Sequence, residues 1–153
     1  MPKRNANTGY NTNLASEFLI MSLLHRAGKD AYLSLGNKKG VDIIVMTESG
    51  AYILIEVKGV NKKSDDWLIC NSGRLPTGPN LFYALVTFES KIEILTTLPN
   101  FWIIPSIQLE AKTEHKISKS NGKTVFLSHK GIKENYSKYC NTLEALEVYL
   151  NNN

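Results

Sequence analysis

Two short apolar segments on either side of a turn constrain the fold of this chain more than any other feature. Residues 43–46 read Ile-Ile-Val-Met and residues 52–55 read Tyr-Ile-Leu-Ile. Strands that are apolar on both faces are typical of central strands covered by helices on each side. Between them, Gly50 fits the left-handed last position of a three-residue hairpin loop, which pairs Thr47 with Ala51.

The rest of the chain supplies further strands and helices to enclose this hairpin. A first helix is expected to begin at Thr12 or Asn13 and to end before Gly28, with an apolar stripe of Leu14, Phe18, Met21 and Leu24. Strands are expected at 31–35, 41–46 and 51–57 as a meander, then at 81–88, 101–104 and 124–127, with at most a short one at 67–70. Later helices are expected from Ser106 to about Lys116 and from Asn141, which forms a capping box with Glu144. The pattern is that of an α/β fold.

Composition points to one compact domain. The chain has 153 residues, 42% of them hydrophobic, and a net charge of +4, a mild excess that tolerates a polyanionic partner without requiring one. We assign residues 12–150 to a single domain and residues 1–11 to a flexible basic arm. Cys70 and Cys140 stand far apart without metal-binding spacing, which argues against zinc and disulfides and favours the cytoplasm. No segment is apolar and long enough to predict a membrane span.

Three charged residues interrupt the apolar strands. Glu56 and Lys58 are two residues apart, so they share one face of their strand, while Val57 points to the opposite face and can enter the core. The hairpin register expected from Gly50 places Asp42 opposite Glu56. Two facing carboxylates repel each other unless a cation lies between them, so this pair predicts a site.

Two interpretations of these charges remain open. Mg²⁺ held by Asp42 and Glu56, with Lys58 orienting a water or stabilising developing charge, suits the hydrolysis of phosphodiester bonds. Alternatively, Lys58 neutralises both acids in a structural ion cluster without a metal.

The order of first helix, strand, Val41-Asp42, hairpin and Glu56-Val57-Lys58 resembles the PD-(D/E)xK nuclease superfamily over roughly residues 12 to 60. The resemblance implies a restriction endonuclease-like fold, with a central mixed sheet flanked by helices, and a metal-dependent endonuclease that hydrolyses DNA. It implies that Asp42, Glu56 and the Val57 carbonyl bind Mg²⁺, for which Mn²⁺ would substitute, and that Lys58 serves catalysis. Val41 stands where the motif has proline, which changes no metal ligand.

Glu17 lies on the expected apolar stripe of the first helix, where a solvated carboxylate is out of place. The same resemblance implies that Glu17 is an additional metal ligand. Alternatively, Glu17 lies at the edge of the stripe and reaches solvent, or pairs with Arg26 or Lys29.

Basic residues in the loops near these strands are candidates for binding nucleic acid, namely Lys38, Lys39, Lys62, Lys63 and Arg74. Lysine pairs of this kind also occur on ordinary solvated surfaces. DNA is the expected partner, while RNA and a homodimer remain open. The alternative function is a catalytically silent nuclease-fold module that binds DNA or another partner.

Overall fold

The computed structural model describes residues 8–35, 40–112, 115–117 and 123–153, with the backbone alone for residues 8, 110–112 and 115–117. The first half of the chain forms α1 (Thr8–Arg26), β1 (Asp30–Leu33), β2 (Ile43–Met46), β3 (Tyr52–Val60) and β4 (Trp67–Cys70). The second half forms β5 (Leu81–Thr87), β6 (Asn100–Pro105), α2 (Ser106–Lys112), β7 (His115–Ile117), β8 (Val125–Leu127), α3 (His129–Asn135), η1 (Ser137–Tyr139) and α4 (Glu144–Asn151). Within these residues, no helix is long and apolar enough to cross a membrane.

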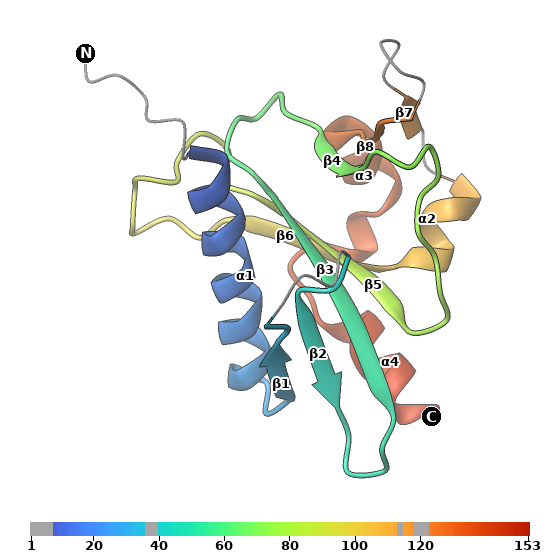
Figure 1. Cartoon of the computed structure of the whole chain (residues 1–153). Helices are drawn as coiled ribbons and strands as arrows, with labels where there is room; N and C mark the ends of the chain where they lie inside the picture. The colour runs from blue at the N-terminus through green and yellow to red at the C-terminus, as the bar shows by residue number, and fades with distance from the viewer. Residues whose placement is uncertain (1–7, 36–39, 113–114, 118–122) are drawn as a thin grey trace.

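A mixed five-stranded sheet in the order β1-β2-β3-β5-β6 forms the centre of the molecule (Figure 1). β1, β2 and β3 form the predicted antiparallel meander, and β6 is antiparallel to β5. β3 and β5 run parallel, and residues 61–80 between them contain β4 and no helix. The predicted α/β class, with a central mixed sheet flanked by helices, is confirmed.

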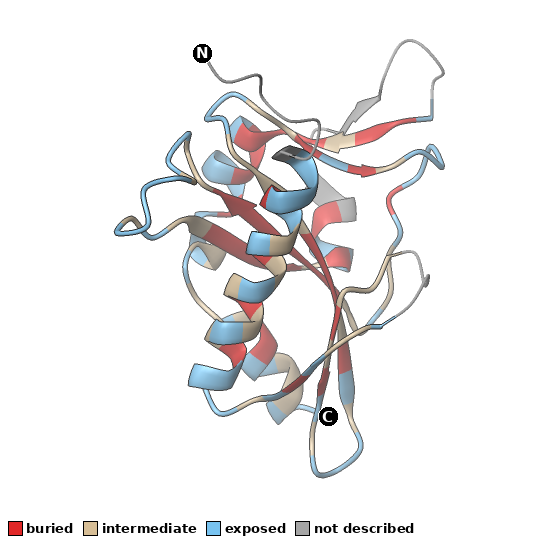
Figure 2. Cartoon of the chain, turned by 60° about the vertical axis from the view of Figure 1, so that its left-hand side comes forward, coloured by how far each residue is buried: buried red, intermediate tan, exposed pale blue. Residues whose placement is uncertain are grey.

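α1 and α4 cover one face of this sheet. Ile20 and Leu24 of α1 and Leu146 of α4 pack with buried residues of all five strands, among them Ile55 and Val57 of β3. In Figure 2 the strands behind α1 are coloured as buried along most of their length. Burial of these β-branched and aliphatic side chains is the main stabilising contribution to this layer.

A second, smaller sheet in the order β4-β8-β7 covers part of the opposite face, together with α2 and α3. Trp67 of β4 is fully buried against this face, and its indole N–H donates to the Val86 carbonyl oxygen at 2.9 Å. Tyr83 and Leu85 of β5 and Ile104 of β6 complete this second core. The cover stops short of β1, β2 and the first half of β3.

The first helix differs from its prediction in two ways. It begins at Thr8, so residues 8–11 belong to the helix and not to a loose arm, while residues 1–7 lie outside the described residues. Its buried positions are Thr12, Ser16, Ile20 and Leu24, and the side chain of Phe18, predicted to be buried, is 55% exposed. The first two turns meet the end of β3 through small side chains instead of the large apolar side chains of the predicted stripe.

The predicted cover on both faces of the hairpin strands is wrong for the half near the turn. Met46 and Tyr52 point to the face that the second sheet does not reach, and both are exposed. Their neighbours Val45 and Ile53 point to the α1 face and are fully buried. The apolar residues of these strands therefore predict more burial on this face than the structure shows.

The C-terminal elements also differ from their predicted bounds. α2 ends at Lys112, short of the expected Lys116, and is followed by β7. β7 pairs antiparallel with β8, which confirms the predicted strand at 124–127, while the predicted Asn121-Gly122 turn lies outside the described residues. α3 was not predicted. α4 begins at Glu144 and lacks the expected capping box, because the side-chain oxygen of Asn141 accepts a hydrogen bond from the Phe101 N–H instead.

Candidate active site

The hairpin has the register predicted from Gly50 as far as Ile43, the residue next to Asp42. Ile43 pairs with Ile55, and the Thr47 N–H donates to the Ala51 carbonyl oxygen at 2.9 Å. Asp42 precedes β2 by one residue, and its N–H donates to the Ile55 carbonyl oxygen at 2.9 Å. In a regular ladder the Ile55 carbonyl oxygen accepts from its paired residue Ile43, so the pairing becomes irregular at Asp42, where β2 has ended, and Asp42 is not paired directly with Glu56 as predicted.

The Asp42 carboxylate takes the place of the next β2 residue in the hydrogen bonding of β3. Its Oδ2 accepts a hydrogen bond of 2.7 Å from the Val57 N–H, while the Val57 side chain is buried against the α1 face, as predicted. The N–H groups of a strand lie in the plane of the sheet and point toward the neighbouring strand position. The Asp42 carboxylate therefore lies at the edge of β3 and not on the face that carries Glu56. The N–H and C=O of one strand residue point to the same side, so the Val57 carbonyl faces this edge as well.

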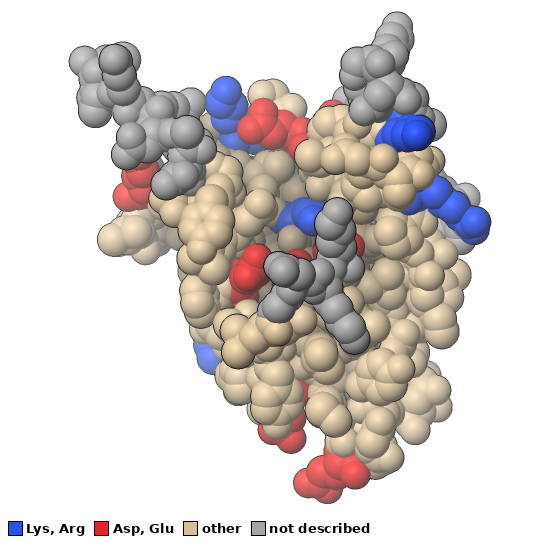
Figure 3. All heavy atoms as spheres, viewed as in Figure 1, with Lys and Arg blue, Asp and Glu red and all other residues tan. Residues whose placement is uncertain are grey.

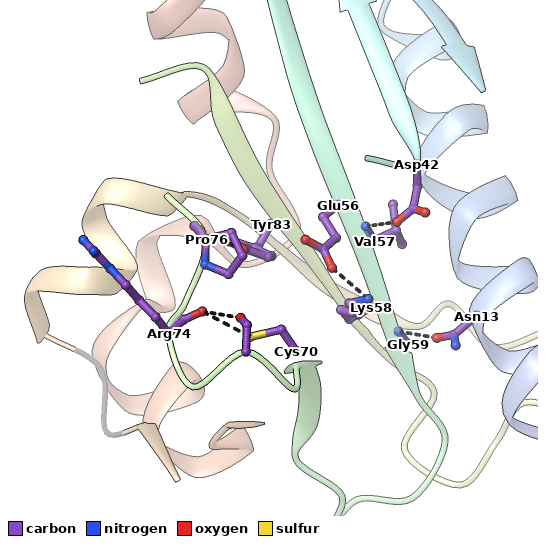
Figure 4. Close-up of polar contacts among 11 residues, drawn as sticks. Asn13, Asp42, Glu56, Val57, Lys58, Gly59, Cys70, Arg74, Pro76 and Tyr83 are labelled. Atoms are coloured by element: carbon purple, nitrogen blue, oxygen red, sulfur yellow. Dashed lines mark hydrogen bonds and ion pairs between the residues drawn. The ribbon is translucent and has the colours of Figure 1, made fainter. Parts of the chain in front are cut away.

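Glu56 and Lys58 share one face of β3, and their side chains form an ion pair of 2.8 Å between Glu56 Oε1 and Lys58 Nζ. The Glu56 side chain is 6% exposed and that of Lys58 is 27% exposed, so solvent reaches the pair from the lysine side. Figure 4 shows Asp42 on the α1 side of β3 and Glu56 on the β5 side. The second half of β3 thus carries the buried Glu56 carboxylate and the Lys58 ammonium group on one face, and the Asp42 carboxylate lies at its edge.

Two further residues enclose the buried carboxylate. Tyr83 is the neighbour of Glu56 across the parallel β3–β5 pair, and its hydroxyl donates to the Pro76 carbonyl oxygen at 2.8 Å. Burial, with the negative charge of Glu56 as a smaller cause, raises the pKa of Tyr83 far above its ordinary value, so the hydroxyl keeps its proton. On another side, a Cβ atom at Gly40 would lie 3.5 Å from Glu56 Oε2, so this backbone passes close to the carboxylate.

Glu17 approaches the same group of charges from α1. Burial raises the pKa of Glu17, the negative charge of Asp42 raises it further, and the positive charge of Lys58 lowers it. Glu17 therefore lies within electrostatic reach of both residues, on the edge of α1 beside its buried side. The alternative ion pair between Glu17 and Lys29 is not seen. Instead, Lys29 Nζ lies 3.6 Å from Glu147 Oε1.

The oxygen atoms around the second half of β3 are of the kinds that bind a small divalent cation such as Mg²⁺. Mg²⁺ sites in proteins commonly use one or two carboxylates and leave further positions to water and substrate phosphate. Asp42 and the Val57 carbonyl at the edge of β3 and Glu56 on its face are oxygen donors of these types. Within the described part of the chain, no three His, Cys, Asp or Glu side chains lie close enough to hold one ion, so Glu17 does not complete a three-carboxylate cage in this conformation.

The predicted basic residues do not all meet at this site. Lys62 lines a hollow of about 540 Å³ beside Gly59 and the start of α1, whereas Lys63 lines another of about 590 Å³ beside His129 of α3. Arg74 is turned away from Glu56 on the far side of its loop (Figure 4). Lys38 and Lys39 lie outside the described residues. Figure 3 shows acidic and basic atoms side by side in the central hollow of this face, next to α1.

Sequence reasoning missed the groups that tie α1 to the site. The Gly59 N–H donates to Asn13 Oδ1 at 3.2 Å. A Cβ atom at position 59 would lie 2.9 Å from the Thr12 carbonyl oxygen and closer still to Ser16 Oγ. The glycine directly after Lys58 was a usable signal, because glycine within a strand often marks a close backbone approach.

No family model and no curated protein matches this sequence. Among solved structures, the chain is similar to a bacterial homing endonuclease, I-Ssp6803I, with a TM-score of 0.45 and 15% sequence identity. The similarity covers 76% of this chain and 72% of that one.

Proposed function

We propose that this chain is a metal-dependent nuclease of the PD-(D/E)xK type that hydrolyses phosphodiester bonds of DNA. The observation that carries the proposal is the arrangement around residues 56–58. Asp42 bonds to the Val57 N–H at 2.7 Å on one side, and Lys58 pairs with Glu56 at 2.8 Å on the other. Two carboxylates, a backbone carbonyl and an ammonium group are the groups that this hydrolysis needs.

Asp42, Glu56 and the Val57 carbonyl would hold Mg²⁺, with Glu17 as an additional ligand and Mn²⁺ as a substitute. When bound, the ion would offset the charge of the phosphate and lower the pKa of a bound water.

The side chains have separate tasks in this proposal. Lys58 would donate a hydrogen bond to the attacking water or to the phosphate oxygen that gains charge. Water attacks phosphorus, the bond from phosphorus to the leaving oxygen breaks, and the products are a phosphomonoester and an alcohol. Tyr83 would hold the wall beside Glu56 and would take no part in proton transfer, because burial keeps its hydroxyl protonated.

The decisive experiment measures the cleavage of linear, circular and branched DNA with Mg²⁺ or Mn²⁺. The wild type should cleave at least one of these substrates, and Lys58→Ala should lose cleavage while keeping its fold. Lys29→Ala is the matched control, because Lys29 also forms an ion pair and its side chain is 24% exposed. If Lys58→Ala cleaves at the wild-type rate, Lys58 has no catalytic role.

Thermal unfolding with and without Mn²⁺ separates this proposal from a structural ion cluster, which the Glu56–Lys58 ion pair also fits. A ligand that binds the folded chain stabilises it, by about 2.7 kcal/mol at a free concentration of 100 times Kd. Mn²⁺ should raise the melting temperature of the wild type and leave that of Asp42→Ala unchanged. The same small shift in both proteins would favour the ion cluster. DNA binding without cleavage would favour the silent module.

A further inference from the structure

One face of the hairpin region is apolar and open. Tyr32 of β1, Met46 of β2 and Tyr52 of β3 are 56%, 47% and 50% exposed, although the opposite face of the same strands lies in the core. Ile44 and Leu54, which point to the same face, are half-buried. We call these five residues the open face. Exposed apolar residues gathered on one face of a sheet are often functional.

The open face lies on the same side of β3 as Glu56 and Lys58 of the candidate active site. Tyr32 pairs with Ile44 and Ile44 with Leu54, so these three form one row across the strands, and Met46 pairs with Tyr52 in the next row. Glu56 follows Leu54 on the same side of β3. At the rise of a strand, Leu54 lies about 7 Å and Tyr52 about 13 Å along β3 from Glu56. A substrate that reaches Lys58 and continues along β3 toward the turn would pass over this surface.

The charge of the open face argues against contacts with phosphates there. None of residues 30–33, 43–46 and 52–55 is Lys or Arg. The exposed acid Asp30 pairs with Met46, so it stands on the same face at the end of that row, and the exposed acid Glu48 lies in the turn after β2. A phosphate backbone needs cationic partners, whereas an unpaired base needs a flat apolar surface on which it can stack. Two half-exposed tyrosine rings supply such a surface, because a tyrosine ring offers a wide apolar face at little cost in side-chain entropy.

We propose that unpaired bases stack on the open face, next to the phosphate that is cleaved. This proposal rests on the proposed nuclease function. The substrate class would then be DNA with a single-stranded segment adjoining the cleavage position, because bases in an intact duplex are not free to stack on a protein surface. The distance of about 13 Å from Glu56 to Tyr52 corresponds to about four nucleotides stacked at about 3.4 Å each, and to fewer in an extended strand.

The test compares the binding of a blunt duplex with that of the same duplex carrying a single-stranded extension. Binding is measured by fluorescence anisotropy with Ca²⁺ over a series of salt concentrations, in Lys58→Ala protein to suppress cleavage. In that protein, Tyr32→Leu and Tyr52→Leu keep an apolar side chain and remove the aromatic ring. Each should weaken binding to the extended substrate about tenfold and leave the blunt duplex unaffected.

The salt dependence distinguishes stacking from charge contacts. Loss of one phosphate contact reduces the slope of log affinity against log salt by about 0.7 on a single strand and about 0.9 on a duplex, whereas loss of a stacking contact leaves that slope unchanged. The tenfold loss should therefore be the same at every salt concentration. Phe18→Leu is the matched control, because Phe18 is an aromatic residue of α1 with a similar exposed fraction of 55%. This substitution should not change the binding of either substrate.

Three results would overturn the proposal. The first is that Tyr32→Leu and Tyr52→Leu bind the extended substrate as well as their parent does. The second is that they weaken both substrates equally. The third is that light scattering shows a dimer that Tyr52→Leu dissociates without a change in DNA binding, which would make the open face a contact between two copies of the chain.

These failures are distinguishable from a failure of the nuclease function. If the wild type cleaves DNA and the tyrosine variants bind normally, only the open-face proposal is wrong. If the wild type neither binds nor cleaves any of the DNA substrates, the nuclease function is wrong and the open-face proposal fails with it.

Discussion

The two halves of β3 obtain their hydrogen bonds in different ways. Residues 52–55 pair with the backbone of β2 in a regular antiparallel ladder. From Glu56 onward β2 has ended, and side chains replace it on that side. Asp42 accepts from the Val57 N–H and Asn13 accepts from the Gly59 N–H. On its other side, β3 pairs with β5 from Leu54 to Val60, and the Leu54 N–H donates to the carbonyl oxygen of Asn80, the residue before β5.

This difference explains why the charged residues gather at the second half. A neighbouring strand would occupy both the N–H and the C=O groups of the edge. A side-chain acceptor such as Asp42 satisfies the N–H alone, so the Val57 carbonyl remains directed toward the same edge as the carboxylate. The end of one strand therefore creates room for α1, which brings Glu17 to this edge.

The largest effect should come from closing the space between α1 and the second half of β3. Gly59→Ala would place a Cβ atom 2.9 Å from the Thr12 carbonyl oxygen, which belongs to the backbone and cannot turn aside. We expect a loss of about 3 kcal/mol in the free energy of unfolding, measured by urea denaturation. The control Gly9→Ala, whose Cβ would meet nothing within 4 Å, should not destabilise the chain. Equal stability of Gly59→Ala and wild type would contradict the close approach.

Removing the Asp42 carboxylate should have the next largest effect. Asp42→Ala leaves the half-buried Val57 N–H without its acceptor, and we expect a loss of about 1–2 kcal/mol by urea denaturation without metal. Asp42→Asn keeps a side-chain oxygen and should recover part of this loss, while neither variant should respond to Mn²⁺ as the wild type does. Equal stability of both variants and the wild type would show that this hydrogen bond contributes nothing.

The effect of Glu17 should depend on pH and reverse with metal. Burial and Asp42 raise the pKa of Glu17 above its ordinary value of 4.5. As the pH rises through this value, the unfolded chain loses its proton first, so the folded state is destabilised until Glu17 also ionises. Glu17→Gln should therefore be the more stable protein at pH 7, by less than about 1 kcal/mol because Glu17 is partly solvated, and equal to wild type near pH 3.5.

The same variant tests the metal proposal. With Mn²⁺ at pH 7, the wild type should gain more in melting temperature than Glu17→Gln, because a cation offsets the repulsion between Glu17 and Asp42. If both proteins gain equally, Glu17 is not a metal ligand.

Asn13→Ala should have the smallest effect. The Gly59 N–H would lose its acceptor at 3.2 Å, but water can replace it because the bond is exposed. We expect a loss of about 0.5 kcal/mol at most by urea denaturation. A loss as large as that of Asp42→Ala would show that the two side-chain acceptors of β3 are equivalent.

The hairpin could be predicted because its information is local. Gly50 adopts a φ of 85°, as the predicted left-handed turn position requires, and this position alone determines which β2 residue faces which β3 residue. That register holds from Met46 to Ile43 and breaks down at Asp42, so it brings Asp42 close to residues 56 and 57 without pairing it with Glu56. The direction of the Asp42 side chain does not follow from the register either, because the backbone N–H that attracts it becomes available only where β2 stops.

Other features depend on contacts between distant segments. The parallel pairing of Glu56 with Tyr83 joins strands separated by a long irregular connection, and no local pattern specifies it. The buried stripe of α1 contains Thr12 and Ser16 because Gly59 allows the helix to approach closely, so the pattern of large apolar residues, which includes the exposed Phe18, does not mark the buried side. α3 has only seven residues, too few for a periodic pattern, although Ser128 does cap it.

The parallel pairing of β3 with β5 also has a consequence for the order of folding. A hairpin forms in about 1–10 μs, whereas pairing between segments distant in the sequence is slower because a long loop must first close. Asp42 and Glu56 are therefore brought together early, before Tyr83 and the loop that contains Pro76 arrive to enclose Glu56. During this interval the two acids repel each other in an unfinished sheet. We expect the rate of refolding, and not only the final stability, to depend on whether a divalent cation is present from the start.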